Sequence, residues 1–396
     1  MGRRQPLSSS APLLQASCLA GQISAYETTV WNIVVIEEKK YHHRFDGIFQ
    51  VKEMLRELGY NVRLSDKLIA RNNADIAWIQ NAILQRCPID SQPKICYERH
   101  ASGTVGDAAS LLRSDVFIYT KEIGYITKDR YLSPLVDNRH HTTLIAPDLR
   151  ASAKSDPILN ETLLDKISIL HPIYRQEARF SPYFSVEHQK KARITDHRKR
   201  SIDVFFSGNV YFRSSESRIA GPLITQHRKT LVAKLSNSLP ERVVRLIGIG
   251  KALSPDEFRK QLLRSKIFVS PYGWGEYSWK DFEAALSGCI LVKPQSSFLK
   301  SYGPALYQNA IVECQPDYSD LPEVIDRILC SLNQFQQRAQ AMRKELVDAR
   351  TNDQSYAADI ALAFSTLSVT RQKRKGSLHP RRLSYLTNII TALRSR

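Results

Sequence analysis

The chain has 396 residues, which is long enough for two domains of ordinary size. Hydrophobic residues make up 42% and charged residues 24%, a globular composition that excludes disordered and collagen-like chains. No apolar run is long enough to cross a bilayer, so a transmembrane helix is not expected. The net charge of +18 predicts attraction to anions, namely nucleotide phosphates, nucleic acid or an acidic membrane surface.

The basic excess is concentrated in two segments, 190–200 and 371–396. The first has six basic residues and one acidic residue, and the second has eight basic residues and no acidic one. We interpret both as solvated linkers or tails. The six cysteines include no Cys-x-x-Cys pair and no metal-ligand spacing, which favours a reducing compartment. We therefore expect a cytoplasmic protein.

The beginning of the chain, residues 1–26, contains Arg3 and Arg4, several serines and no acidic residue. Its apolar stretch is interrupted by Gln15 and Ser17, which makes it a poor match to a signal peptide. We expect a disordered or targeting segment here.

Two series of alternating strand and helix patterns follow. The first occupies 27–171, begins with an apolar run and favours a parallel sheet covered by helices on both faces. The strands expected in it are 30–36, 61–64, 75–79, 94–97, 115–119 and 142–146. A basic linker is expected at 172–200.

The second series, at 201–350, is more regular. Helix signals are clear in it, because Ser254-Pro255-Asp256-Glu257 is a capping-box start and Gly288 suits the end of a helix over 279–286. Five strands with helical crossovers predict a doubly wound, Rossmann-like domain that binds ligands at the carboxyl ends of its strands. The strands expected in it are 202–206, 243–249, 267–270, 290–292 and 310–313, and the other helices are 219–239 and 321–349.

The first candidate loop follows the apolar strand that ends near Phe206. Gly208 comes directly after this strand, and a glycine there lets a phosphate approach backbone N–H groups. Arg213 follows close enough to add a positive charge. The alternative interpretation is an ordinary tight turn.

The second candidate is Val269–Pro294, which contains a strand, a loop rich in glycine and aromatic residues, a short helix and another strand. The loop ends at a helix N-terminus, where N–H groups and the helix dipole favour an anion. We expect Ser278 to cap the helix or bind a phosphate oxygen, and Lys280 to add a positive charge. Glu283, one turn later, suits ribose hydroxyls, and Tyr277 suits a base or sugar; the alternative is capping and packing alone.

The residues of this segment also carry a family resemblance. Glu283–Gly288 resembles the acidic-residue helix of GT-B glycosyltransferases, and Tyr277–Pro294 is similar to CAP10-like and exostosin-like transferases. The resemblance implies two Rossmann-like α/β domains that face each other across a cleft, with the acceptor on the N-terminal one and the nucleotide-sugar on the C-terminal one. It implies that Ser278 and Lys280 hold the donor diphosphate, although the relatives carry arginine, a bidentate fork, where this chain has lysine.

Retaining members often have a second glutamate eight residues before the first. Counting back from Glu283 gives Gly275, with Glu276 one position away, so both stereochemical outcomes stay open. An inverting reaction needs a general base, and His43, Asp46 and His100 are candidates in N-terminal loops. No Asp-x-Asp motif follows a strand, so we expect neither a metal nor a cofactor besides the nucleotide-sugar substrate.

These observations predict an enzyme that moves a sugar from a nucleotide-sugar to a glycan, lipid or protein acceptor without a metal. One alternative is an inactive nucleotide- or glycan-binding protein of the same fold. The other is a nucleic-acid-binding protein, for which no recognition motif is present. In the C-terminal helix and basic tail, 351–396, apolar residues at helical spacing predict a helix that lies either on an anionic membrane or on the protein itself.

Overall fold

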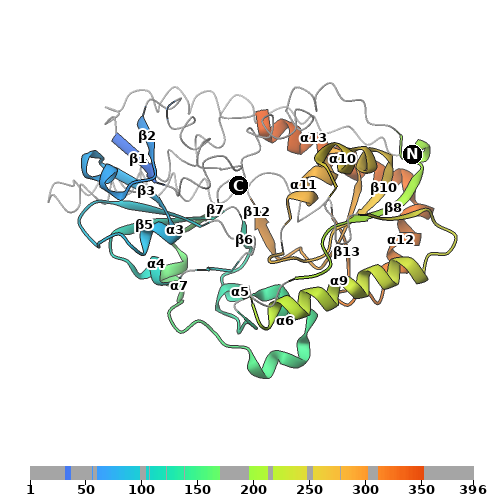
Figure 1. Cartoon of the computed structure of the whole chain (residues 1–396), viewed down its shortest axis with the longest axis horizontal. Helices are drawn as coiled ribbons and strands as arrows, with labels where there is room; N and C mark the ends of the chain where they lie inside the picture. Colours follow the sequence, from blue (N-terminus) through green and yellow to red (C-terminus); the bar gives the residue numbers. More distant parts are fainter. Residues whose placement is uncertain are drawn as a thin grey trace, which may run out of the picture.

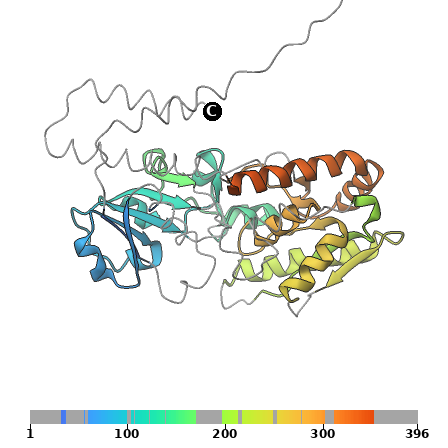
Figure 2. The same cartoon turned by 90° about the horizontal axis from the view of Figure 1, so that it is seen from above.

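The protein is built from two α/β units that lie side by side, each around its own parallel sheet (Figures 1 and 2). In Figure 1 the first unit is coloured blue to teal and the second green to red. The computed structural model describes residues 32–36, 56, 60–98, 104–106, 108–121, 123–137, 139–169, 196–212, 217–247, 253–276, 278–301 and 311–351.

The first sheet has six strands in the order β2-β1-β3-β4-β5-β7, all parallel to their neighbours. Its central strands are buried along nearly their whole length, as in sheets covered on both faces. The strands are β1 (Asn32–Ile36), β2 (Asn61–Ser65), β3 (Ile76–Gln80), β4 (Lys94–Glu98), β5 (Val116–Lys121) and β7 (Ile167–Ile169). The helices among them are η2 (Leu68–Asn73), α3 (Asn81–Leu84), α4 (Ala108–Leu112), α5 (Asp129–Leu132), α6 (His140–Ile145), η3 (Pro147–Ser152) and α7 (Glu161–Leu164).

The second sheet has five parallel strands in the order β13-β11-β10-β8-β9. Counted from the first strand of each unit, both sheets begin with the order 2-1-3-4-5, so the strand order reverses between the first and third strands in each. The strands are β8 (Ile202–Ser207), β9 (Val244–Ile247), β10 (Ser265–Val269), β11 (Ile290–Pro294) and β13 (Val312–Cys314). The longer helices are α9 (Ala220–Asn237), α10 (Pro255–Arg264), α11 (Trp279–Leu286), α12 (Leu321–Cys330) and α13 (Leu332–Thr351).

One strand prediction is wrong. Residues 142–146 were expected to form a strand, and the structure places helix α6 there instead. Threonine and isoleucine favour strands locally, but tertiary packing overrides this preference because α6 buries His140, His141 and Thr142. The last strand of the first sheet is β7, which the sequence did not reveal.

The two units are joined by a segment of the first unit. Strand β6 (Ile123–Tyr125) pairs antiparallel with β12 (Leu299–Ser301) of the second unit, and both lie between the two sheets in Figure 1. Helix α6 lies against α9. The predicted linker, 172–200, lies outside the described residues up to 195, so its limits stay a prediction.

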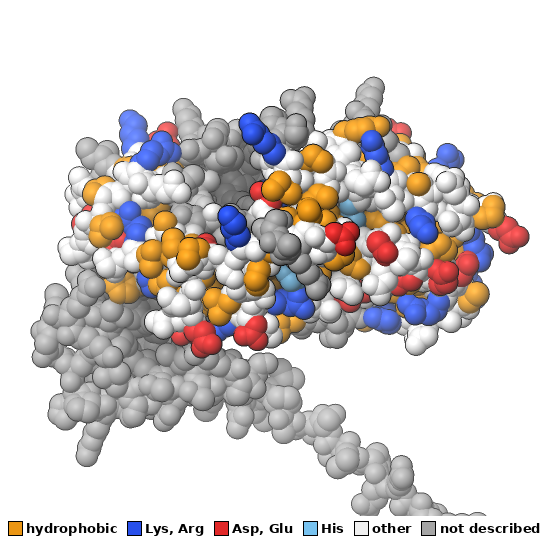
Figure 3. All heavy atoms as spheres, turned by 90° about the horizontal axis from the view of Figure 1, so that it is seen from below, with side chains coloured by type: hydrophobic (Ala, Val, Ile, Leu, Met, Phe, Trp, Pro, Cys, Tyr) orange, Lys and Arg blue, Asp and Glu red, His pale blue; other side chains and the backbone are white. Residues whose placement is uncertain are grey.

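The charge of the described surface is mixed on the face that Figure 3 shows. Basic and acidic side chains are interspersed there, and they form no continuous basic surface among the residues that are drawn in colour.

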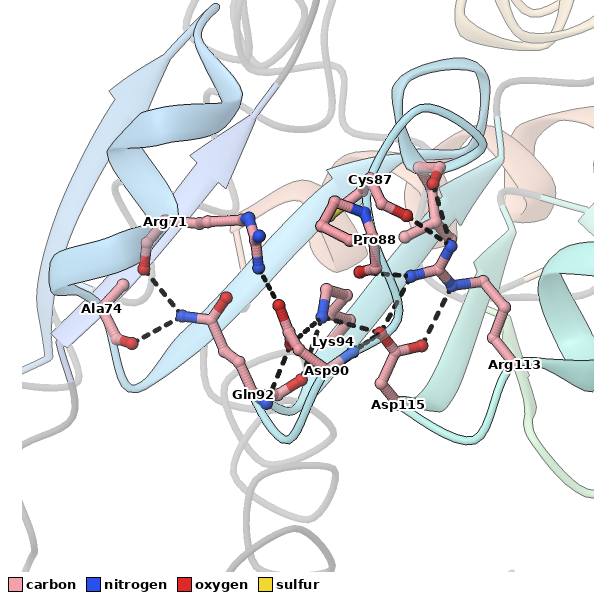
Figure 4. Close-up of polar contacts among 10 residues, drawn as sticks. Arg71, Ala74, Cys87, Pro88, Asp90, Gln92, Lys94, Arg113 and Asp115 are labelled. Carbon is pink, nitrogen blue, oxygen red and sulfur yellow. Dashed lines mark hydrogen bonds and ion pairs between the residues drawn. The ribbon is translucent and has the colours of Figure 1, made fainter.

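A buried ion-pair network stabilises the amino edge of the first sheet (Figure 4). Lys94, the first residue of β4, is fully buried, and its ammonium donates to Asp90 at 2.6 Å and to Asp115 at 2.7 Å. Arg113 donates to the same Asp115 carboxylate at 2.8 and 3.0 Å, and Arg71 pairs with Asp90. Ligands bind at the carboxyl ends of the strands, so this network at their amino ends is structural.

The network should be sensitive to acid. Burial raises the pKa of Asp90, but the hydrogen bonds from Lys94 and Arg71 outweigh burial and lower that pKa to about 2. An unfolded aspartate has a pKa of about 3.9. Asp90 therefore stabilises the fold fully above pH ~4, and this stabilisation is lost as the pH falls toward 2.

We predict that Lys94→Ala lowers the free energy of unfolding by about 3 kcal/mol at pH 7, because Asp115 stays buried with a weakened set of partners. The matched control is Lys128→Ala, which removes an exposed pair with Asp165 and should cost less than about 1 kcal/mol. Urea unfolding of both variants measures the difference. Equal losses in the free energy of unfolding would show that the buried network stabilises the fold no more than an exposed ion pair does.

Candidate functional site

The candidate site lies at the switch point of the second sheet, between β8 and β10. The chain leaves β8 at Ser207 and β10 at Val269, and the helix α11 begins after the second of these loops. In an open parallel sheet, ligands bind outside the carboxyl ends of the two strands at which the order reverses. Both loops that the sequence singled out, after β8 and after β10, begin at this point.

Two cations from different helices meet at the end of β8. Arg228 of α9 donates to the carbonyl of Asn209 at 2.6 Å and to the carbonyl of Tyr272 at 2.8 Å, so it joins the two loops. Lys280, in the first turn of α11, donates to the carbonyl of Ser207 at 2.7 Å. Both charges therefore lie close to the backbone at Gly208.

Gly208 and Gly273 permit this close approach. A Cβ atom at Gly208 would lie 3.2 Å from Arg228 Nη1 and 3.5 Å from Lys280 Nζ. A Cβ atom at Gly273 would lie 3.0 Å from Arg228 Nη2. Any larger residue at either position would displace the guanidinium. The predicted role of Gly208, to let charge approach the backbone, is thus consistent with its surroundings.

A third cation, Lys293 of β11, is fully buried beneath the loop. Its ammonium lies 3.2 Å from the Asp281 carboxylate and 3.4 Å from the carbonyl of Ser270. The same carboxylate accepts from the Ser270 hydroxyl and, at 3.1 Å, from the Ser278 N–H. Asp281 and Lys293 therefore form one neutral pair, which fixes the start of α11.

The pKa values of three charged groups in the site are shifted, because these groups lie away from water and close to one another. Burial, and then the positive charge of Arg228, lower the pKa of Lys280 to about 8. Burial lowers the pKa of Arg228 to about 10. Burial raises the pKa of Glu283 to about 7, although Lys280 opposes this. Such shifts cluster where a site is built for a charged ligand, and an anion beside Arg228 and Lys280 would relieve their repulsion.

The predicted site residues differ in where the structure places them. Ser278 caps α11, with its hydroxyl accepting from the Lys280 N–H at 3.3 Å and a capping box completed by Asp281. Its contact with a phosphate stays a prediction, as does the contact of Glu283 with ribose. The structure brings Gly208 and Lys280 together. The other candidates lie outside the described residues, namely Arg213, Tyr277, His43, Asp46 and His100.

Sequence analysis missed Arg228 and Lys293. Arg228 lies in a long helix with several basic residues, and only the packing of α9 beside β8 distinguishes it from them. Lys293 did carry a signal, because a lysine inside an apolar strand of a parallel sheet needs a buried partner.

Aromatic rings hold Tyr272 behind the loop. The imidazole of His227 stacks on Tyr272 with ring centroids 5.5 Å apart, and its Nε2 lies 2.6 Å from the Tyr318 hydroxyl. On another side His141 of the first unit lies 5.4 Å from the Tyr272 ring. Burial lowers the pKa of His227 well below its usual value, so this imidazole is neutral. These ring contacts hold Tyr272 where its carbonyl accepts a hydrogen bond from Arg228.

Two features are absent from the described part of the chain. In it, no three histidine, cysteine, aspartate or glutamate side chains are grouped so that they would hold a metal ion. None of its helices combines the length and apolar character needed to cross a membrane.

No family model and no curated protein matches the chain. Solved structures similar to it include an α1,3-fucosyltransferase, with 14% identity, a TM-score of 0.36 and coverage of 81% of this chain and 82% of that one. T4 phage β-glucosyltransferase has 10% identity, a TM-score of 0.43 and coverage of 84% and 98%. Sucrose-phosphate synthase from Thermosynechococcus elongatus has 10% identity, a TM-score of 0.42 and coverage of 85% and 99%.

The fold class follows from the topology described above. Two parallel sheets, each doubly wound and with its strand order reversing at the same place, make two Rossmann-like α/β units. The sequence-based prediction of the fold class is therefore confirmed.

We predict that the affinity for inorganic pyrophosphate falls as Lys280 loses its proton. Lys280 is charged below its pKa of about 8, and only about a tenth of it stays charged at pH 9. Affinity relative to the Lys280→Arg variant should therefore fall about tenfold between pH 7 and pH 9 in calorimetric titrations. The ratio cancels the titration of pyrophosphate itself. A constant ratio would remove Lys280 from the anion site.

Proposed function

We propose that the chain is a glycosyltransferase that uses a nucleotide-sugar and binds the donor diphosphate at the switch point of the second sheet. The observation that carries the proposal is the convergence of Arg228 and Lys280 on the backbone at Gly208, beside the N-terminus of α11. When the sugar leaves, negative charge develops on the nucleoside diphosphate. Fixed cations and N–H groups that face this charge lower the barrier.

Each group at the switch point has a role in this proposal. Lys280 exchanges the Ser207 carbonyl for a phosphate oxygen, and Arg228 adds its charge while it holds the two loops together. Fixed cations at this place do the work that a metal does in other transferases, which supports a metal-independent reaction. Glu283, with a pKa of about 7, both donates to and accepts from ribose hydroxyls when it is protonated. Arg213 and Tyr277 complete the proposed donor contacts.

The first unit supplies the acceptor side. Its switch point lies between β1 and β3, and the loops that follow β1 and β4 begin at the carboxyl edge of its sheet. His43 and Asp46 follow β1 in sequence and His100 follows β4, so we propose these three as candidate bases for an inverting reaction. The proposed acceptor is a glycan, lipid or protein. The proposed relatives within the GT-B class are the CAP10-like and exostosin-like transferases.

Removing one charge tests the donor site. We predict that Lys280→Ala weakens binding of nucleoside diphosphates by about 1.5–3 kcal/mol, the value of a charge-assisted hydrogen bond, and that Lys280→Arg keeps most of the affinity. Calorimetry with UDP, GDP and ADP measures this. The control is Lys229→Ala, which removes an exposed charge from the next position of α9. Unchanged affinity in folded Lys280→Ala would withdraw the donor-site assignment.

Turnover separates an enzyme from a binding protein. We expect purified protein to release the diphosphate slowly from one of UDP-glucose, GDP-mannose or ADP-glucose, and faster when acceptor is added. Tight diphosphate binding with no release from any donor would favour the inactive nucleotide-binding protein of the same fold.

A further inference from the structure

Glu276, in the loop between β10 and α11, has a fully buried carboxylate that contacts the other unit. Tyr125 donates its hydroxyl proton to Glu276 Oε1 at 3.0 Å, and His141 Nδ1 lies 3.5 Å from the same oxygen. Glu276 and His141 have no exposed surface, and 3% of Tyr125 is exposed. A carboxylate buried in this way is costly unless its partners stay in place. The loop and the first unit are therefore held together at this point.

His141 contributes to this cluster through its packing. Within the described part of the chain, neither of its ring nitrogens makes a hydrogen bond. Its imidazole is in contact with the Glu276 carboxylate on one side and with the Tyr272 ring on the other. Removing the imidazole would take one first-unit contact from Glu276, which keeps Tyr125, and would take the His141 contact from the Tyr272 ring.

The same segment of the first unit contacts the loop again at Trp274. The Arg139 guanidinium donates to the carbonyl of Trp274 at 3.3 Å and lies 5.6 Å from the centre of the indole ring. Asp137, which pairs with Arg139, also accepts from the Ser217 hydroxyl at 2.5 Å. Ser217 lies just before α9, the helix that carries Arg228. These contacts connect the segment to both sides of the switch point.

Backbone hydrogen bonds complete the connection. The β6–β12 ladder pairs Ile123–Tyr125 with Leu299–Ser301, and the Ile126 N–H donates to the Phe298 carbonyl at 3.0 Å. The ring of His140 packs edge-on against Phe298 at 4.7 Å. Strand β12 follows β11, so this ladder extends the connection to the strand that carries Lys293.

We propose that residues 123–145 of the first unit are a fixed wall of the donor site and that Glu276 is its positioning residue. Glu276 lies two residues before Ser278, the cap of α11, and four before Lys280. A shift of its carboxylate therefore shifts the N-terminus of α11 and the charge on it. The inference rests on the proposed function for its effect on the donor.

Hydrogen exchange of the full chain tests the mechanical part without any donor. In the wild type, amides of β6 and β12 should be as protected as those of β10. Tyr125→Phe removes the hydroxyl that donates to Glu276. It should raise exchange about tenfold both in 123–126 and in the loop 270–276, and it should leave β3 unchanged. The control is Tyr60→Phe, which removes a hydroxyl beside β2, away from the contact between units.

Pyrophosphate binding tests the positioning part. Tyr125→Phe should weaken pyrophosphate binding about threefold to tenfold, less than Lys280→Ala does, because Tyr125 acts only through the loop. Its effect should shrink in the Lys280→Ala background, since the charge that the loop positions is gone. Tyr60→Phe should change neither value.

The outcomes are distinguishable. Freely exchanging β6 amides in the wild type, or a Tyr125→Phe variant whose loop exchanges normally, would overturn the fixed wall even if donors bind. Altered exchange with pyrophosphate affinity unchanged would overturn the positioning role of Glu276. Failure of Lys280→Ala to affect diphosphate binding would instead remove the proposed function and leave the exchange result standing.

Discussion

Arg228 reaches from α9 to the carbonyls of Asn209 and Tyr272, and so holds the loops after β8 and β10 at a fixed separation. Burial of the guanidinium is tolerated because backbone carbonyl oxygens accept hydrogen bonds from its N–H groups. Its guanidinium leaves little room for a side chain at 208 and 273. Burial, and then the charge of Arg228, lower the pKa of Lys280. Arg228 thus adds to the positive charge of Lys280 at the switch point and limits the size of the residues beside it.

The arrangement of the two units has a related consequence. Because each sheet reverses its order between its first and third strands, each unit has one edge at which ligands can meet the backbone. The first unit uses its opposite edge for stability, through the network around Lys94. Part of the first unit also contacts the loop of the second through Glu276. The contacts between the units thus include a segment of the first unit that lies against the loop of the second.

The sequence predicted elements whose signals are local. Helix α11 begins and ends as expected, because Ser278 is a strong cap and Gly288 adopts the positive φ of 71° that glycine tolerates. The alternation of strands and helices gave both parallel sheets. It failed at α6, where contact with the second unit decides the structure. Arg228 and the partners of Glu276 come from elements distant in sequence, and no local spacing marks them.

The proposed donor site requires that the cations around Gly208 bind a diphosphate. A crystal structure of the protein with pyrophosphate would show where the anion binds. We expect a diphosphate between the backbone of Gly208 and the N-terminus of α11, with Lys280 Nζ moved from the Ser207 carbonyl to a phosphate oxygen at about 2.8 Å. A diphosphate bound elsewhere, with Lys280 still on the Ser207 carbonyl, would contradict it.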